Sequence, residues 1–147
     1  MGAVTYPDQR VAKLINDNFV PLQINIVEQP EFTDRFIARW TPTIFILDAE
    51  GREHRRIIGY TPPEDFIVEL SMGLAQEAFD NMRYEEAVSR YEHIAEQYSD
   101  SYLAPEALYM VGVSRYRATN DPSNLEKYWD QVMELYPDSR WAKAGDV

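Results

Sequence analysis

The nonapeptide Trp-Thr-Pro-Thr-Ile-Phe-Ile-Leu-Asp, residues 40–48, limits the possible folds of this chain more than any other segment. Residues 43–47 are an apolar run of strand-forming residues, without the alternation that a half-exposed strand shows. Such a run is typical of a strand covered on both faces, as in an α/β sheet. Pro42 directly precedes it, where a missing N–H breaks no ladder bond and where a cis or a trans bond fits. The sequence therefore predicts a buried strand in an α/β domain.

Helices and strands alternate around this segment. The patterns predict a helix over residues 11–18 capped by Asp8, a strand over 19–26, a helix over 31–39, a tight turn at 48–51, a return strand over 52–60 and a helix over 61–81. The charged first half of the return strand is typical of an exposed sheet edge. Thr61 and Glu64 have the spacing of a capping box at the start of the last helix. Gly73 weakens that helix unless a neighbour packs close to the bare backbone.

The order of these elements, with the Thr-Pro-Thr step, the apolar strand and the Asp-x-x-Gly turn, resembles the thioredoxin fold over about residues 4–70. The resemblance implies that Trp40, Thr41 and Pro42 form a cis-proline loop. In thioredoxin-like proteins this loop holds an extended peptide by backbone hydrogen bonds, as in strand addition. For Trp40 itself two interpretations stay open, a contact with such a peptide and a place in the core.

The chain departs from that family in two ways. It contains no cysteine, so it lacks the Cys-x-x-Cys dithiol, and it lacks the strand that precedes the dithiol in the family. The resemblance therefore implies an incomplete sheet, in which the strands over 19–26 and 43–47 have lost a shared neighbour. Unpaired buried backbone groups are costly. We expect the two strands to pair directly, or a strand from a second copy to fill the gap in a homodimer formed by strand exchange.

The second half has the periodicity of helix pairs. Alanine and aromatic residues recur at the packing positions of a tetratricopeptide repeat, and residues 91–101 resemble residues 129–139 at an offset of about 38. Residues 120–124 are interpreted as a lengthened turn, and Gly112 as a point of close helix approach. Residues 141–144 are expected to begin a capping helix. The segments resemble tetratricopeptide repeats of bacterial envelope-associated scaffold proteins.

The predicted architecture is thus α/β (thioredoxin-like, with an incomplete sheet) followed by all-α tetratricopeptide helix hairpins. The expected domains are residues 1–70 and 71–147, which share the helix over 61–81. That shared helix is expected to couple them.

Composition narrows the possible partners. The net charge of −11 argues against a nucleic-acid surface and against binding to an anionic membrane. No apolar run approaches a membrane span, and no secretory signal is visible, so we expect a cytoplasmic protein, or an envelope protein if the N-terminus is incomplete. His54 and His93 are both expected to face solvent. No cofactor and no metal site is predicted, because no convergent set of ligands stands out.

Two functions from different classes remain. The first is a non-catalytic interaction module that binds a protein or peptide partner. The second is a fragment of a thiol–disulfide oxidoreductase, linked by resemblance to cell redox homeostasis, whose cysteines lie upstream of Met1. Neither hypothesis gives the chain itself an activity, since thiolate chemistry needs a cysteine.

Overall fold

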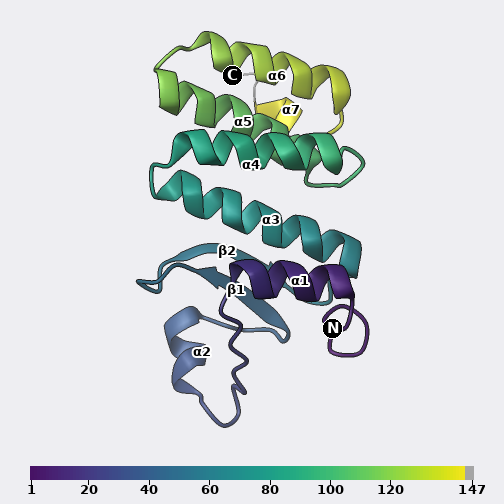
Figure 1. The fold of residues 1–147 in the computed structure, drawn as a ribbon, viewed down its shortest axis with the longest axis vertical. Coiled ribbons are helices and arrows are strands. Elements are labelled where there is room, and N and C mark those ends of the chain that lie inside the picture. Colours follow the sequence, from purple (N-terminus) through teal and green to yellow (C-terminus); the bar gives the residue numbers. More distant parts are fainter. Residues whose placement is uncertain (145–147) are drawn as a thin grey trace. The chain divides into compact units, whose positions relative to one another are not determined.

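The computed structural model describes residues 1–144 of the 147-residue chain. Within these residues the elements are α1 (Gln9–Asn18), α2 (Glu31–Phe36), β1 (Thr43–Leu47), β2 (Glu53–Ile58), α3 (Pro63–Asp80), α4 (Tyr84–Gln97), α5 (Ala104–Thr119), α6 (Ser123–Leu135) and α7 (Arg140–Ala144) (Figure 1). They form two compact units. The first unit comprises Met1–Phe45 and Arg56–Ile67, and the second comprises Ile46–Arg55 and the chain from Val68 onward.

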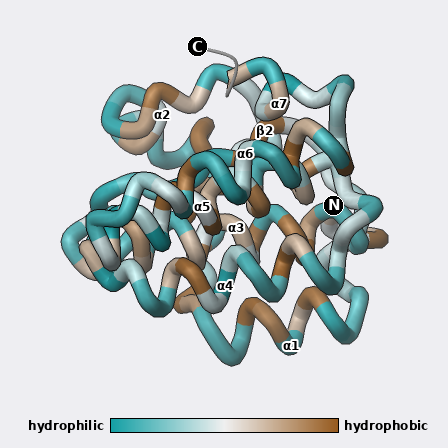
Figure 2. The backbone as a smooth tube through the Cα atoms, turned by 90° about the horizontal axis from the view of Figure 1, so that it is seen from above, coloured by the Kyte–Doolittle hydropathy of each residue, from teal (hydrophilic) through white to brown (hydrophobic). Residues whose placement is uncertain are grey.

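In the first unit, α1 begins where the sequence predicts. Asp8 Oδ1 accepts hydrogen bonds from the backbone N–H groups of Arg10, at 2.9 Å, and Val11, at 3.4 Å, which caps the helix. Apolar and polar stretches alternate along α1 (Figure 2), and Val11 on its apolar side is fully buried. The buried hydroxyl of Thr5 donates to the carbonyl of Thr61 at 2.7 Å, which ties the N-terminal turn to the chain just before α3.

The β1–β2 hairpin confirms the predicted turn. Asp48 Oδ1 accepts from the N–H groups of Glu50 and Arg52, and Gly51 adopts the left-handed region at φ 77°. The predicted burial of both faces of residues 43–47 is wrong, because only Ile46 of β1 is buried. Thr43, Ile44 and Phe45 are only partly buried and Leu47 is exposed, so neighbouring elements do not fully cover both faces of this strand.

The predicted strand over residues 19–26 is also wrong. This segment is not part of any strand, and Val20 and Leu22 are 96% and 79% exposed. Within the described residues the only sheet is β1–β2, so direct pairing of residues 19–26 with β1 does not occur. Alternation gives a strand only where a neighbour accepts its backbone bonds, and Pro21 removes one donor. The helix predicted over 31–39 ends at Phe36, because Ile37 turns into the left-handed region at φ 52°.

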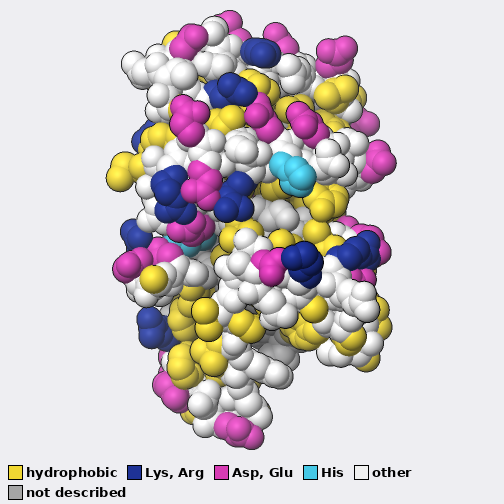
Figure 3. All heavy atoms as spheres, viewed as in Figure 1, with side chains coloured by type: hydrophobic (Ala, Val, Ile, Leu, Met, Phe, Trp, Pro, Cys, Tyr) yellow, Lys and Arg dark blue, Asp and Glu magenta, His cyan; other side chains and the backbone are white. Residues whose placement is uncertain are grey.

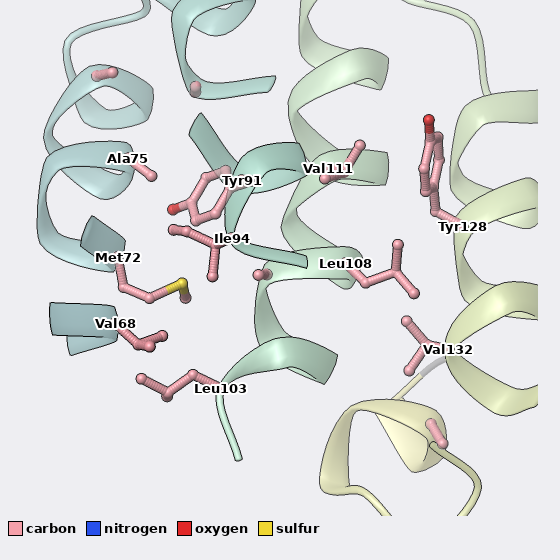
Figure 4. Close-up of a cluster of buried hydrophobic side chains, with 14 residues drawn as sticks. Val68, Met72, Ala75, Tyr91, Ile94, Leu103, Leu108, Val111, Tyr128 and Val132 are labelled. Atoms are coloured by element: carbon pink, nitrogen blue, oxygen red, sulfur yellow. The ribbon is translucent and has the colours of Figure 1, made fainter. Parts of the chain in front are cut away.

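The core of the second unit lies between the helices. α5 packs against α4 on one side and against α6 on the other, and α7 packs against α5 and α6. Apolar side chains from α3 to α7 form one buried cluster (Figure 4), in which Tyr91 and Val111 are fully buried. The predicted close approach at Gly112 is confirmed, since a Cβ there would lie 2.8 Å from Tyr128 Cβ.

The helix predicted over 61–81 is α3, and the packing reason for Gly73 is confirmed. A Cβ at Gly73 would lie 2.1 Å from Ile46 Cδ1. The turn predicted at residues 120–124 begins with Asn120 in the left-handed region, and the helix expected at residue 141 is α7. Within the described residues no helix is both long and apolar enough to cross a membrane.

Candidate functional site

The loop that leads into β1 is the first candidate site. The Thr41–Pro42 peptide bond is cis, and Trp40, Thr41 and Pro42 are all exposed. The hydroxyl of Thr43 donates to the carbonyl of Trp40 at 2.5 Å, and the N–H of Gly59 donates to the carbonyl of Pro42 at 2.8 Å. These two bonds fix the loop to the start of β1 and to the residue that follows β2.

A shallow pocket of about 260 Å³ lies beside this loop in the first unit. Its lining residues come from the segment before β1, from the first residue of β1 and from β2: Ile37, Arg39, Trp40, Thr43, Arg56 and Ile58. Three large apolar side chains here are more than half exposed, Ile37 at 59%, Trp40 at 67% and Ile58 at 62%. Hydrophobic side chains also gather on the surface around α2, the helix that precedes the pocket residues in sequence (Figure 3). The pocket is therefore an apolar surface that faces solvent.

Arg56 holds the segment before β1 in place. Its Nη2 donates to the carbonyl of Phe36 at 2.8 Å, at the C-terminal end of α2, where a cation is favourable. The guanidinium carbon lies 4.7 Å from the centre of the Phe45 ring, and Phe45 itself packs on Phe36 with centroids 5.3 Å apart. Ile37 then leaves the helix in the left-handed region, which β-branched residues rarely adopt. This turn directs the chain toward Trp40.

Both charged side chains that line the pocket are arginines, although the chain carries a net charge of −11. Arg39 is exposed, and within the described residues its side chain forms no hydrogen bond or ion pair. The remaining polar lining group is the Thr43 hydroxyl. The lining residues thus offer apolar contact and hydrogen-bond donors to a ligand.

The sequence identified only part of this pocket. Trp40 lines it, whereas Thr41 and Pro42 lie exposed beside it. The alternative in which Trp40 fills a core is wrong, because two thirds of its surface is exposed. Sequence reasoning missed Ile37, Arg39, Arg56 and Ile58. The predicted hairpin could have indicated Arg56 and Ile58, because a turn at 48–51 places residues 56–58 opposite residue 43.

A second cluster, within the second unit, surrounds His54. The side chain of His54 is only 3% exposed, so the expectation that it faces solvent is wrong, whereas the same expectation for His93 is confirmed. His54 Nδ1 lies 2.6 Å from Asp80 Oδ2, and Nε2 lies 2.9 Å from Asp48 Oδ2. Arg52 Nε also donates to Asp48 Oδ2, at 2.7 Å. The cluster fastens the hairpin turn to the C-terminal end of α3.

These contacts favour a positively charged imidazole. Burial alone would lower the pKa of His54, but the hydrogen bonds and negative charges of Asp80 and Asp48 outweigh it and raise the pKa above its usual value. Burial would raise the pKa of Asp48, but bonds from His54 and Arg52 hold it at about 2. A histidine that donates from both nitrogens is a poor base. Within residues 1–144 no group of side chains has the arrangement of a metal site.

A comparison with known protein families agrees with the fold class predicted for the first half of the chain. Residues 3–72 match the model of a family described as a thioredoxin-like domain. No curated protein and no solved structure matches the chain. The match covers α1, α2, the hairpin and the first half of α3, and the rest of the described chain is helical.

Proposed function

We propose that this chain is a non-catalytic protein-interaction module, in which a thioredoxin-like domain binds an extended peptide segment at the pocket beside Pro42. The observation that carries the proposal is the set of exposed apolar side chains around that pocket. Ile37, Trp40 and Ile58 are each more than half exposed, on backbone that hydrogen bonds hold in place. A fixed apolar surface open to solvent is typical of a binding site.

The backbone next to the pocket supports an extended ligand. β1 begins at Thr43, one of the lining residues, and within the described residues it pairs with β2 alone. Its second edge forms no ladder with another strand of the described residues, and we propose that the peptide adds there. In strand addition, main-chain bonds provide affinity and side-chain pockets provide specificity. We assign the first role to the edge of β1 and the second to the pocket.

The cysteine content favours binding over redox chemistry for this chain. A thiol–disulfide step needs a thiolate, and the sequence has none. A peptide held by backbone bonds and apolar contacts needs no cysteine.

The helical half is proposed to be a pair of tetratricopeptide-type hairpins that offers a second protein-binding surface. Support comes from the succession of α3 to α6 and from the residues at the repeat positions. Ala75, Ala87, Tyr91 and Ile94 are buried in the common core. The close contact of Gly112 with Tyr128 lets α5 and α6 approach as a hairpin.

Fluorescence anisotropy with a labelled peptide tests the proposal. The host peptide alternates valine and glutamine, so that it is extended and neutral, and it is titrated with the full chain. We expect saturable binding that Trp40→Ala weakens by about tenfold or more, because the variant loses an aromatic side chain that the bound peptide would cover. The control Trp141→Ala, in α7, retains binding. No saturable binding by the wild type, or equal loss in both variants, would contradict the proposed site.

A further inference from the structure

The charges at the pocket point to the class of peptide that it selects. We propose that the pocket beside Pro42 prefers an extended peptide that carries an acidic side chain next to an apolar one, with Arg39 as the residue that recognises the carboxylate. This inference rests on the proposed function, since it specifies the ligand of the same site.

The first argument is the sign of the lining charges. The chain has 25 acidic and 14 basic residues, yet the pocket is lined by two arginines and by no acidic residue. The two arginines attract an acidic peptide to the pocket, whereas the acidic remainder of the surface repels it. The charge of the lining therefore favours binding of an acidic peptide at this pocket.

The second argument is how the two arginines differ. Arg56 has its guanidinium over the Phe45 ring and donates to the carbonyls at the end of α2, so its position is fixed by the fold. Arg39 is exposed next to Trp40, and no side chain of the described residues neutralises it. A guanidinium with free donors binds a carboxylate in a bidentate manner. Arg39 is therefore the specificity-determining residue, and Arg56 shapes the wall beside it.

The third argument is the apolar surface that adjoins the charge. Ile37, Trp40 and Ile58 are exposed around the same hollow. A peptide with an acidic side chain alone would leave these three apolar side chains in water. A peptide with an acidic and an apolar side chain on the same face can contact Arg39 and the apolar side chains together. In a strand, residues i and i+2 lie on one face.

The test compares three versions of the neutral host peptide that differ at one central position, with glutamine, glutamate or lysine. At about 50 mM salt we expect the glutamate peptide to bind about threefold to tenfold more tightly than the glutamine peptide, and the lysine peptide to bind most weakly. That range matches one partly exposed ion pair and should shrink at about 500 mM salt. Arg39→Gln should bring the glutamate-to-glutamine ratio of affinities close to one.

Arg35→Gln is the matched control, because Arg35 is an exposed arginine of the same unit that does not line the pocket. It should keep the preference for glutamate. Equal binding of the three peptides by the wild type, or an unchanged preference in Arg39→Gln, would overturn this inference while leaving peptide binding intact. Failure of the wild type to bind any of the three would instead overturn the proposed function, and the inference with it.

Discussion

His54 Nδ1 lies 2.6 Å from Asp80 Oδ2, and this contact joins the β1–β2 hairpin to the last turn of α3. The other ring nitrogen faces Asp48, whose carboxylate also accepts from Arg52. Gln76 donates to the remaining oxygen of Asp80. Both ring nitrogens of His54 face carboxylate oxygens, which can only accept hydrogen bonds. Both contacts are therefore hydrogen bonds only when each nitrogen carries a proton.

The first prediction concerns pH. The pKa of His54 is raised in the folded chain, so its stabilising contribution is complete below about pH 6.5 and is lost as the pH rises through the folded pKa. We expect the free energy of unfolding, measured by chemical denaturation, to fall as the pH rises through the folded pKa, because a carboxylate loses its donor. His54→Gln should remove the dependence, and His93→Gln should keep it. A wild-type profile that is flat on the alkaline side would contradict the assignment.

The second prediction concerns helix packing at Gly112. A Cβ there would lie 2.8 Å from Tyr128 Cβ and 3.2 Å from the carbonyl oxygen of Asn124, neither of which can rotate away. We expect Gly112→Ala to destabilise the helical part by about 1–3 kcal/mol, despite the better helix propensity of alanine. Ser89→Ala, at an exposed position of α4, is the control and should change stability by less than about 0.5 kcal/mol. A stabilised Gly112→Ala variant would show that the two helices do not approach as described.

The third prediction concerns the ion pairs of Arg55. Its Nε donates to Glu69 at 2.5 Å and its Nη1 donates to Glu106 at 3.2 Å, and all three side chains are at most 20% exposed. Arg55→Leu leaves two poorly solvated carboxylates without their common partner, at an expected cost of about 3–5 kcal/mol. Arg90→Leu breaks a more exposed pair with Glu86 and should cost less than about 1 kcal/mol. The free energy of unfolding of both variants is measured by urea denaturation. An equal loss in Arg55→Leu and Arg90→Leu would contradict the difference in burial between the two sets of ion pairs.

The fourth prediction concerns residues 20–24. Val20 and Leu22 are strongly exposed, and within the described chain the amides of residues 20 and 22–24 form no backbone hydrogen bond. At low protein concentration these amides should exchange with solvent almost as fast as in an unstructured peptide, while those around Tyr91 should be protected. Protection of the segment that increases with concentration would indicate the homodimer by strand exchange. Slow exchange in a dilute monomer would contradict the extended, unpaired conformation.

The features that sequence predicted correctly are those fixed by local chemistry. Asp8 caps α1 because an aspartate side chain reaches the N–H groups two and three residues further on, those of Arg10 and Val11, and β1 coincides with residues 43–47. The sequence indicates close helix approach at Gly112, and at Gly73 it leaves close packing as the one reason for a residue that otherwise weakens a helix.

The features that sequence missed depend on contacts between distant residues. Alternation over residues 19–26 predicted a strand, but a strand also needs a neighbour, and alternation does not supply one. Charged neighbours in sequence favour an exposed His54, whereas its ring is buried and contacts Asp80, 26 positions away. The pocket combines residues 37–43 with β2, so Trp40 was found and its partners Arg56 and Ile58 were not.

The most direct test of the central claim maps the bound peptide on the isotopically labelled full chain by NMR. Titration with the glutamate-containing peptide should shift the backbone amides of Ile37, Trp40 and Ile58 and of the open edge of β1, with amides of α4 to α6 unchanged. Such a result would place an extended ligand at the pocket. Shifts confined to the helical half, or no shifts at saturating peptide, would contradict the account of this pocket as the binding site.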